Sequence, residues 1–366
     1  MRKKKILIIG LTERMGGVET FIYNTTRFSN KNKYEYEYLV HGTDHCVFQN
    51  QISEFYGQED CIHFVRKYKE NPFGCIKDLV LFYCRNGKKY SYVHLETGAN
   101  SEVLYVFPFN VFLDFKVISH SHNGNGSNPL INSLFRPIVN MISAKRLSCS
   151  KVATEWLFGK KYIDKTIIIN NGIDTDKFIY SLDKRIRIRK QYDLKNEFLI
   201  GHIGRFSEQK NHEFILKIFK KIIFEDSSAK LMLVGVGEKE VIIRQLCNEM
   251  QLDKSVIFAG SQMEIEAYYC AFDVFLMPSL YEGLPIVGIE AQAEGLPCFF
   301  SSNISEKILI TDRATVTSLD VPDDKWAKNI MLNKGLGQRE KYAKVVKEKG
   351  YDIHETVKIL EKVYEV

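Results

Sequence analysis

The sequence predicts an α/β protein built from two doubly wound domains, each with a parallel sheet covered by helices on both faces. The chain has 366 residues, which is long for one domain and ample for two hydrophobic cores. Short apolar runs typical of buried strands alternate with amphipathic segments along almost the whole chain. This alternation occurs twice, on either side of a break near residues 176–196. The break contains a charged stretch at 183–196 (DKRIRIRKQYDLKN), which we interpret as a solvated linker and helix face.

The expected strands follow one another between helical patterns. Residues 211–225 (NHEFILKIFKKIIFE) carry apolar side chains at helical spacing and predict one of the covering helices. Strands of the first half are expected at 4–10, 36–42, 90–96, 115–121 and 146–151. Strands of the second half are expected at 166–172, 198–206, 230–237, 256–260, 274–279 and 297–302.

Composition and charge exclude several classes of protein. The net charge of +6 is mild: it fits an anionic ligand or a loose attraction to an anionic membrane face, and no nucleic-acid-binding motif accompanies it. No apolar run reaches the roughly 18 residues of a transmembrane helix, and the basic N-terminus is expected to lead into a strand, not a signal peptide. Eight cysteines without a C-x-x-C pair favour reduced thiols in a cytoplasmic protein, without a disulfide framework or zinc site.

One segment, residues 103–118 (VLYVFPFNVFLDFKVI), is unusually apolar. We interpret it as a core helix that leads into the strand at 116–119, because it is shorter than the about 20 residues that span a bilayer. In the alternative interpretation, Phe107, Phe109, Phe112 and Phe115 contact lipid or a lipid-linked acceptor.

Candidate ligand-binding residues follow the strands, because ligands of open parallel sheets bind beyond the carboxyl ends of the strands. Gly16 and Gly17 follow the first strand and lead into a helix whose first turn carries Glu19. Paired glycines allow a ligand to approach the backbone closely, and a helix N-terminus offers free N–H groups to a phosphate. Taken alone, the two glycines are better explained by a plain turn. The pattern is not G-x-G-x-x-G, so a nicotinamide site has no support.

Two histidines, His120 and His122, end the strand at 116–119. Alternate residues of a strand point to the same side, so both side chains are expected to face one way. Such a pair suggests a metal site, but no third ligand lies close in sequence. We therefore expect one of them to contact a substrate.

Cations and glycines follow the strands of the second half. Arg205 and Lys210 lie between a strand and the N-terminus of the helix at 211–225, where two cations could hold a diphosphate. Surface ion pairs are the simpler interpretation. Gly235 and Gly237 form another loop of close approach after the next strand.

Two glutamates, Glu282 and Glu290, stand in the apolar stretch PSLYEGLPIVGIEAQAEGLP at 278–297. Burial of an unpaired carboxylate is costly, so each glutamate requires a partner or a ligand. Glu282 is expected on the loop after a strand, and Glu290 inside a helix that begins near Ile286. The N–H groups of residues 283–287 could meet a phosphate, and Glu290 could bind a vicinal diol such as that of a ribose. An acid near a helix N-terminus is also favoured by the helix dipole alone.

In combination these motifs resemble the retaining glycosyltransferases of family 4, nearly from end to end. The motifs are GGVE at 16–19, NNGID at 170–174, GRFSEQKN at 204–211, LVGVGE at 233–238, VIFAG at 256–260 and the 278–297 stretch. SHSHN at 119–123 resembles the branch that builds bacterial capsule, exopolysaccharide or O-antigen. The resemblance implies the GT-B fold, in which two Rossmann-like domains face each other across a deep cleft. The implied domains are an acceptor-side domain at 1–178, a donor domain at 179–350 and a helix at 351–366 that packs back towards the first domain.

The resemblance also implies roles for individual residues. Arg205 and Lys210 would hold the donor diphosphate and the charge of the leaving group in place of a metal ion. Glu282 would touch the donor sugar and Glu290 the ribose, while one of the two histidines would lie near the reacting carbon. Catalytic residues are therefore expected among His120, His122, Arg205, Lys210 and Glu282. The donor-binding residues are expected to be Gly16, Gly17, Gly204, Arg205, Lys210, Gly235, Glu282, Gly283, Leu284, Pro285, Ile286 and Glu290.

The expected reaction moves a sugar from a UDP-sugar, or a GDP-sugar, to a lipid-linked or free glycan. No metal or other cofactor is expected, and the D-x-D triplet at 174–176 is expected to be structural. A monomer or homodimer at the inner face of the cell membrane would fit. Two alternatives are a sugar-nucleotide epimerase of the same architecture and a catalytically inactive subunit that binds nucleotide sugars. An epimerase would require an acid/base set that the sequence does not show, and an inactive subunit would be expected to lack Lys210 or Glu282.

Overall fold

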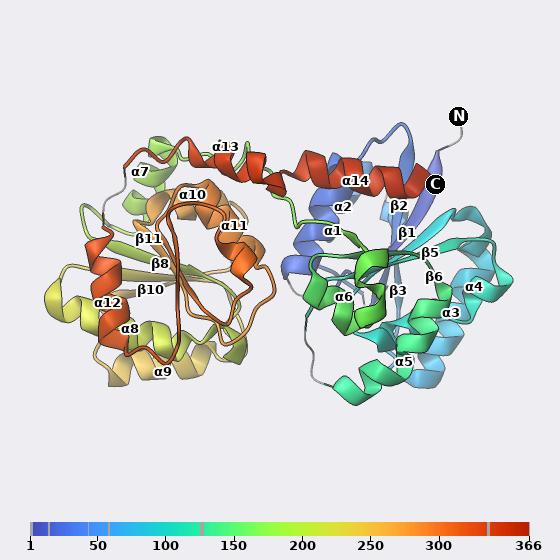
Figure 1. The fold of residues 1–366 in the computed structure, drawn as a ribbon, viewed down its shortest axis with the longest axis horizontal. Coiled ribbons are helices and arrows are strands. Elements are labelled where there is room, and N and C mark those ends of the chain that lie inside the picture. Colours follow the sequence, from blue (N-terminus) through green and yellow to red (C-terminus); the bar gives the residue numbers. More distant parts are fainter. Residues whose placement is uncertain are drawn as a thin grey trace. The chain divides into compact units, whose positions relative to one another are not determined.

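The computed structural model describes residues 3–13, 15–42, 44–57, 59–124, 128–334 and 337–365. The chain forms two compact units, one made of residues 1–172 and 353–366 and the other of residues 173–352 (Figure 1). The units change over at 172/173 and 352/353, whereas the sequence placed the domain boundaries at 178/179 and 350/351. Each unit is an α/β domain around a parallel sheet, so the predicted fold class is confirmed.

The first unit contains a seven-stranded sheet of order β3-β2-β1-β4-β5-β6-β7, and all its pairs are parallel. β7 was expected in the second half of the chain but pairs with β6 of this sheet, so that expectation was wrong. The short, half-exposed β3 was not predicted. The strands are β1 (Lys4–Ile9), β2 (Tyr34–His41), β3 (Ile62–Val65), β4 (Tyr92–Thr97), β5 (Lys116–Ser121), β6 (Ser143–Ser148) and β7 (Ile167–Ile168).

Helices cover both faces of this sheet. On one face α3, α5 and α6 share a core with alternate strand residues such as Val93 and Leu95. The other face is covered by α1 and α14, and the Lys4 ammonium donates to the carbonyl of Tyr364 in α14 at 2.7 Å. The helices are α1 (Gly17–Phe28), α2 (Gln49–Tyr56), α3 (Pro72–Asn86), α4 (Phe109–Phe112), α5 (Pro129–Ile142), α6 (Lys151–Leu157) and α14 (Ile353–Glu365).

The apolar segment 103–118 does not form the expected core helix. It consists of the end of a 3₁₀ helix (Asn100–Tyr105), the single turn of α4 and the start of β5. Phe115 is buried, whereas the Phe112 side chain is 80% exposed. The segment therefore contributes one aromatic side chain to the core and exposes another.

The second unit contains a six-stranded parallel sheet of order β10-β9-β8-β11-β12-β13. The four-residue strand β13 is only half-buried and was not predicted. The strands are β8 (Leu199–Ile203), β9 (Lys230–Val234), β10 (Val256–Gly260), β11 (Val274–Met277), β12 (Cys298–Ser301) and β13 (Ala314–Thr317). The helices are α7 (Leu182–Gln191), α8 (His212–Glu225), α9 (Glu240–Glu249), α10 (Ile265–Ala271), α11 (Ile286–Ala293), α12 (Asp323–Leu332) and α13 (Tyr342–Val346).

For the charged stretch at 183–196, the expectation of a helix face is confirmed, but the expectation of a solvated linker was wrong. Most of it is α7, which belongs to the second unit. The Arg185 guanidinium pairs with Asp273 at 2.6 Å, and Arg189 is buried and donates to backbone carbonyls. Opposite charge and carbonyl acceptors satisfy these two largely buried cations, which sequence charge alone does not reveal.

The strand orders place one switch point in each sheet. β1 lies between β2 and β4, and β8 lies between β9 and β11. Connections leave such a central pair towards opposite sides, which opens a crevice beyond their carboxyl ends. The loops after β1, β4, β8 and β11 are therefore placed to form ligand sites. Within the described residues, no helix is sufficiently long and apolar to cross a membrane.

Candidate functional site

Two loops of the second unit are joined at the carboxyl edge of its sheet. One follows β8 (residues 204–211) and the other follows β11 (residues 278–285). The N–H of Leu280 donates to the carbonyl of Gln209 at 2.8 Å, and the Gln209 side chain donates to the carbonyl of Tyr281. The Asn211 side chain donates to the carbonyl of Pro278 at 3.0 Å. Three hydrogen bonds thus fix the two loops as one surface.

This surface brings Lys210 and Glu282 together. The Lys210 Nζ lies 2.6 Å from the Glu282 Oε1, and the two side chains are only 14% and 12% exposed. An ion pair partly removed from water is stronger than a surface pair and is held in one geometry. The cation and the carboxylate, 72 positions apart in the chain, therefore form one preorganised group.

Arg205 lies on the same loop but has a different partner. Its Nη2 and Nε contact Glu238 Oε2 at 2.8 and 3.1 Å, and the side chain is 41% exposed. Arg205 thus pairs with Glu238 and not with Glu282. Its predicted role at the diphosphate stays a prediction.

The glycines of these loops permit close packing of backbone on backbone. Gly235 has φ of +138°, and a Cβ there would lie 2.2 Å from the carbonyl oxygen of Gly204. A Cβ on Gly204 would lie 3.2 Å from the Lys210 side chain. A side chain at either position would displace the loop or the lysine. Gly235 is thus required locally, whereas a side chain at Gly204 would require its neighbours to shift slightly.

The second glutamate of the stretch lies inside α11, as expected. Pro285 precedes the first helical residue, Ile286, and the loop at 282–283 is fixed by backbone bonds to 303–305. Glu290 is buried, and its Oε2 accepts a hydrogen bond from the Tyr269 hydroxyl at 2.9 Å. Burial raises the pKa of Glu290 to about 7, although the Tyr269 hydrogen bond opposes this shift. Glu290 therefore has a structural partner, and a role at a ribose stays a prediction.

At the carboxyl edge of the first sheet, Gly16 and Gly17 begin α1. Gly16 is the N-cap, and a Cβ there would lie 2.7 Å from Glu19 Oε2. Glu19 is buried and accepts a hydrogen bond from the Thr12 hydroxyl at 2.7 Å. Burial raises the pKa of the Glu19 carboxyl. Gly16 thus leaves room for a carboxylate to fold back over the helix start, a contact that the sequence did not predict.

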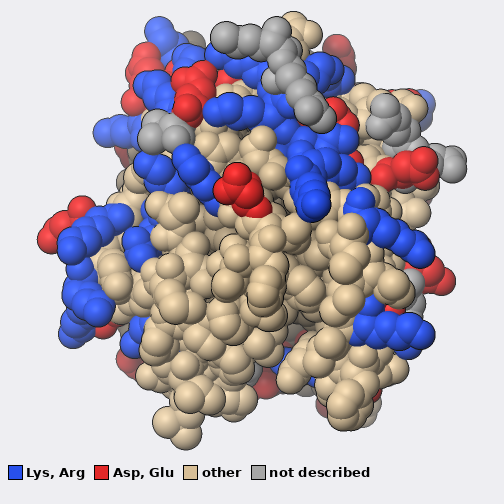
Figure 2. All heavy atoms as spheres, turned by 90° about the vertical axis from the view of Figure 1, so that its right-hand side faces the viewer, with Lys and Arg blue, Asp and Glu red and all other residues tan. Residues whose placement is uncertain are grey.

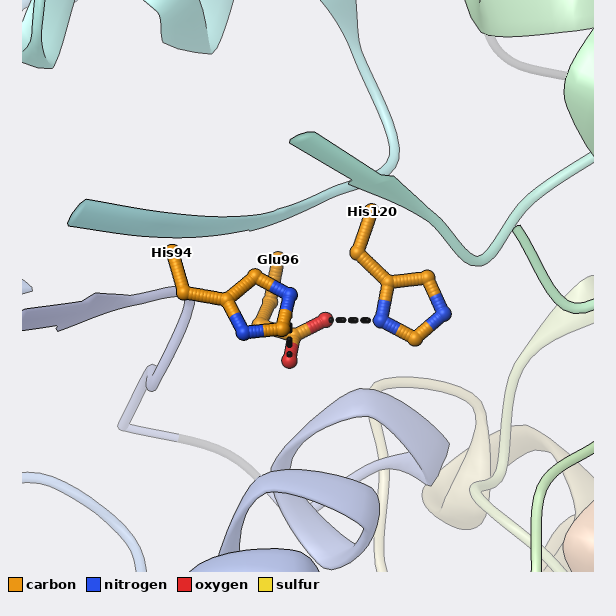
Figure 3. Close-up of side chains that lie close together, drawn as sticks. All are labelled: His94, Glu96 and His120. Carbon is orange, nitrogen blue, oxygen red and sulfur yellow. Dashed lines mark ion pairs between the residues drawn. The ribbon is translucent and has the colours of Figure 1, made fainter. Parts of the chain in front are cut away.

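The two predicted histidines meet a carboxylate that was not predicted from the sequence. Glu96 of β4 is the register partner of His120 of β5, so both side chains leave the same face of the sheet. Figure 3 shows the Glu96 carboxylate between the rings of His94 and His120. Glu96 Oε1 lies 3.3 Å from His94 Nε2, and Oε2 lies 2.8 Å from His120 Nδ1 and 2.6 Å from His122 Nε2.

The charge of this cluster follows from its contacts. Burial would raise the pKa of Glu96, but the three imidazoles outweigh it and hold that pKa well below its ordinary value. Burial lowers the pKa of His120 to about 4 and also lowers that of His94. The cluster is therefore an ionised carboxylate surrounded by imidazoles, of which His94 and His120 are neutral near pH 7.

The same cluster is the candidate for a metal ion within the described residues, because ligand atoms of His94, Glu96 and His120 lie within 4.8 Å of one another. Two ligands of a tetrahedral zinc ion, each about 2.1 Å from it, stand about 3.4 Å apart. Glu96 Oε2 and His120 Nδ1 are closer than this, and Oε2 also accepts a hydrogen bond from His122. The geometry is that of carboxylate–imidazole contacts, so we do not interpret the cluster as a metal site.

A signal for the missed residues was present in the sequence. H-x-E at 94–96 and H-x-H at 120–122 each place polar residues at alternate positions of a buried strand. Either pattern alone is uninformative. Only the pairing of β4 with β5 shows that the two patterns share a face.

Two Rossmann-like domains, each around a parallel sheet, define the GT-B class, and the comparisons with solved structures agree. HepE of Anabaena, solved in complex with UDP-glucose, has a TM-score of 0.82 at 15% identity and covers 99% of this chain and 100% of its own. Residues 197–331 match the family described as Glycosyl transferases group 1, so the second unit carries a glycosyltransferase domain of that family.

Curated relatives carry glycosyltransferase names as well. EpsF of Bacillus subtilis (strain 168), named as a glycosyltransferase, is 28% identical over 100% of this chain and 97% of its own. An α-1,3-galactosyltransferase of Escherichia coli, named for UDP-Gal and an α-D-GlcNAc-diphosphoundecaprenol acceptor, is 35% identical over 38% of each chain. The predicted enzyme class, a glycosyltransferase, is thereby confirmed, whereas the retaining mechanism stays a prediction.

Proposed function

We propose that this protein is a retaining glycosyltransferase that moves a sugar from a UDP-sugar to a lipid-linked glycan during synthesis of a cell-surface polysaccharide. The observation that carries the proposal is the Lys210–Glu282 pair on two joined loops at the carboxyl edge of a glycosyltransferase domain. That edge is where open parallel sheets bind their ligands.

The pair suits the departure of a nucleoside diphosphate. Negative charge develops on the phosphate as the sugar–oxygen bond breaks, and a fixed cation stabilises that charge without reorganisation. Glu282 holds Lys210 in place from one side and can accept hydrogen bonds from sugar hydroxyls with its other oxygen. The helix α11 begins four residues after Glu282, and N–H groups at the start of a helix can donate to the same phosphate. These groups would replace a divalent ion, so we propose that the enzyme needs no metal.

The choice of donor is supported by two named proteins. HepE was solved with UDP-glucose, and the E. coli relative is named for UDP-Gal. Both donors are uridine diphosphate sugars. We therefore place UDP-sugars ahead of GDP-sugars.

The choice of acceptor is supported by an apolar surface of the first unit. Leu130 and Leu134 of α5 are 83% and 71% exposed, and Phe73 of α3 and Phe112 of α4 are also strongly exposed. Figure 2 shows one face of the molecule whose lower half carries few charged side chains, below a group of Lys and Arg. Large exposed apolar side chains on the first unit, and a face with few charges below a group of Lys and Arg, fit the interface of an anionic membrane, where a lipid-linked acceptor would reside.

Donor selection tests the proposal directly. The melting temperature is measured with a panel of UDP-glucose, UDP-galactose, UDP-N-acetylglucosamine and GDP-mannose, because a ligand bound to the folded state stabilises it by mass action. One UDP-sugar should raise the melting temperature more than UDP alone. The same sugar should then appear in a lipid extract of vesicles that carry undecaprenyl-diphosphate glycans. Release of an epimer, or binding without any turnover, would instead support one of the two alternatives.

A further inference from the structure

The environment of Glu96 determines where protons lie on the neighbouring histidines. An ionised carboxylate only accepts hydrogen bonds, so the nitrogen that contacts it must carry the proton. His122 Nε2 makes that contact at 2.6 Å. In the neutral ring Nδ1 is then unprotonated, and it is buried with no hydrogen-bond partner among the described residues.

The remaining contacts hold the cluster in this state. His94 Nδ1 lies 2.6 Å from the hydroxyl of Tyr364 in α14, so a donating tyrosine leaves the proton of His94 on Nε2, towards Glu96. From α1, the Phe21 ring packs edge-on against His120 and His122 at centroid distances of 5.1 and 5.0 Å. Helices on this face of the sheet thus restrict both the rotation and the tautomer of the imidazoles.

We propose that Glu96 is a positioning residue that holds His122 as the Nε2–H tautomer, with Nδ1 available as a hydrogen-bond acceptor. His122 would then recognise a hydroxyl group of the substrate and not a phosphate oxygen, because only the hydroxyl can donate to a bare nitrogen. This inference rests on the proposed glycosyltransferase function, since the hydroxyl in question is that of a sugar.

Nuclear magnetic resonance of the imidazole nitrogens tests the tautomer without any substrate. Long-range proton–nitrogen spectra of the ¹⁵N-labelled full chain distinguish protonated from bare ring nitrogens, and His122→Asn assigns the signals of that ring. At pH 7.5 we expect the Nε2–H tautomer for His122 in the wild type. The Nδ1–H tautomer in the wild type would overturn the inference, and this result requires no variant that folds.

Glu96→Gln then tests the cause. The amide can donate as well as accept, so the proton of His122 is no longer confined to Nε2, and the fraction of the Nδ1–H tautomer should rise. Glu37→Gln is the matched control, because Glu37 is a buried carboxylate of the same sheet that contacts His63 Nε2 at 2.8 Å. It should change the signals of His63 and leave those of His122 unchanged. Identical His122 signals in Glu96→Gln and the wild type would overturn the inference.

Turnover separates a positioning role from a structural one. Glu96→Gln should lower kcat/KM for the active UDP-sugar by about 100-fold or more, since loss of the carboxylate that orients a catalytic histidine reduces kcat up to about 10⁴-fold in serine proteases. Glu37→Gln should stay within about threefold of the wild type. If Glu96→Gln also stays there, the inference fails.

Two further outcomes remain distinguishable. If no UDP-sugar is turned over by the wild type while the His122 tautomer still depends on Glu96, the proposed function fails and the positioning of His122 by Glu96 is supported. If the purified wild type holds one zinc ion per chain and Glu96→Gln holds none, Glu96 binds a metal and the inference is overturned.

Discussion

Glu96 in the first unit and Glu290 in the second are both buried carboxylates, yet their acidities move in opposite directions. Glu96 contacts three imidazoles, and its pKa lies well below the ordinary value. Glu290 contacts one tyrosine hydroxyl, and burial raises its pKa to about 7. Similar burial thus accompanies pKa shifts of opposite direction, because the partners and not the depth decide which form is favoured. Glu282 is less buried than either of these two acids and forms an ion pair with Lys210.

The largest expected effect concerns the cation of the Glu282 pair. Lys210→Ala should lower turnover of the active UDP-sugar by about 100-fold or more, because it removes a fixed charge next to the developing negative charge. Lys334→Ala is the matched control, since Lys334 forms an ion pair with Asp226 at 2.8 Å elsewhere in the same unit. The control should remain near wild-type activity. Activity of Lys210→Ala within a few-fold of the control would refute the assignment of this loop.

The next effect separates the two glutamates of the 278–297 stretch. Glu282→Gln should mainly lower kcat, and Glu290→Gln should mainly raise the donor KM, each by about tenfold to 100-fold, the equivalent of one charge-assisted hydrogen bond. Steady-state kinetics with melting curves of both variants provide the measurement. A lowered melting temperature together with equal losses in kcat and KM for both variants would indicate a purely structural pair.

Stability against pH sharpens the comparison of the buried acids. In the folded protein Glu290 keeps its proton up to about pH 7, whereas in the unfolded chain it loses it near the ordinary pKa of 4.5. The folded state binds more protons in this window, so the free energy of unfolding falls as pH rises, by an amount on the order of 3 kcal/mol. Glu290→Gln has no carboxyl group to ionise, so its free energy of unfolding does not fall in this way. Its melting temperature relative to that of the wild type should therefore increase from pH 4.5 to pH 7.

For Glu96, the expected change of stability with pH has the opposite sign. Its depressed pKa contributes stability that is fully present above the unfolded pKa and lost as pH falls through the folded one. Glu96→Gln should therefore lose melting temperature relative to the wild type at neutral pH and less in acid. The same sign for both variants in melting curves from pH 3.5 to pH 8 would contradict the contrast between the two carboxylates.

The Lys210–Glu282 pair was easier to predict from the sequence than the Glu96 cluster, for a physical reason. Lys210 and Glu282 follow β8 and β11, and the rule that ligands meet the carboxyl ends of neighbouring parallel strands is sufficient to select both loops. Glu96 lies within β4, so its contact with His120 depends on strand register. A shift of one residue would place Glu96 on the opposite face.

Some parts of the fold could likewise be predicted from the sequence and others could not. The long alternating pattern predicts the parallel α/β class and the long amphipathic helix α8, because burial of one face imposes their periodicity. β3 and β13 have four residues each and are only partly buried, so no periodic signal marks them. Arg185 and Arg189 of α7 were assigned to a solvated linker and helix face, because their partners Asp273 and the backbone carbonyls near it lie about 80 positions away.

The smallest expected effect is that of a chelator. If Lys210 and the first turn of α11 provide the positive charge, turnover should persist in excess EDTA, because no divalent ion is needed at the diphosphate. If the carboxylate–imidazole contacts of Glu96 are complete in themselves, EDTA should also leave the melting temperature unchanged. The two measurements are independent, because turnover in EDTA tests the charge at Lys210 in the second unit and the melting temperature tests the Glu96 cluster in the first. Loss of turnover that Mg²⁺ or Mn²⁺ restores, without a change in melting temperature, would refute the charge assignment at Lys210. A lowered melting temperature that zinc restores would refute the description of the Glu96 cluster, and the contrast between the two buried carboxylates would then reflect a metal ion instead of their partners.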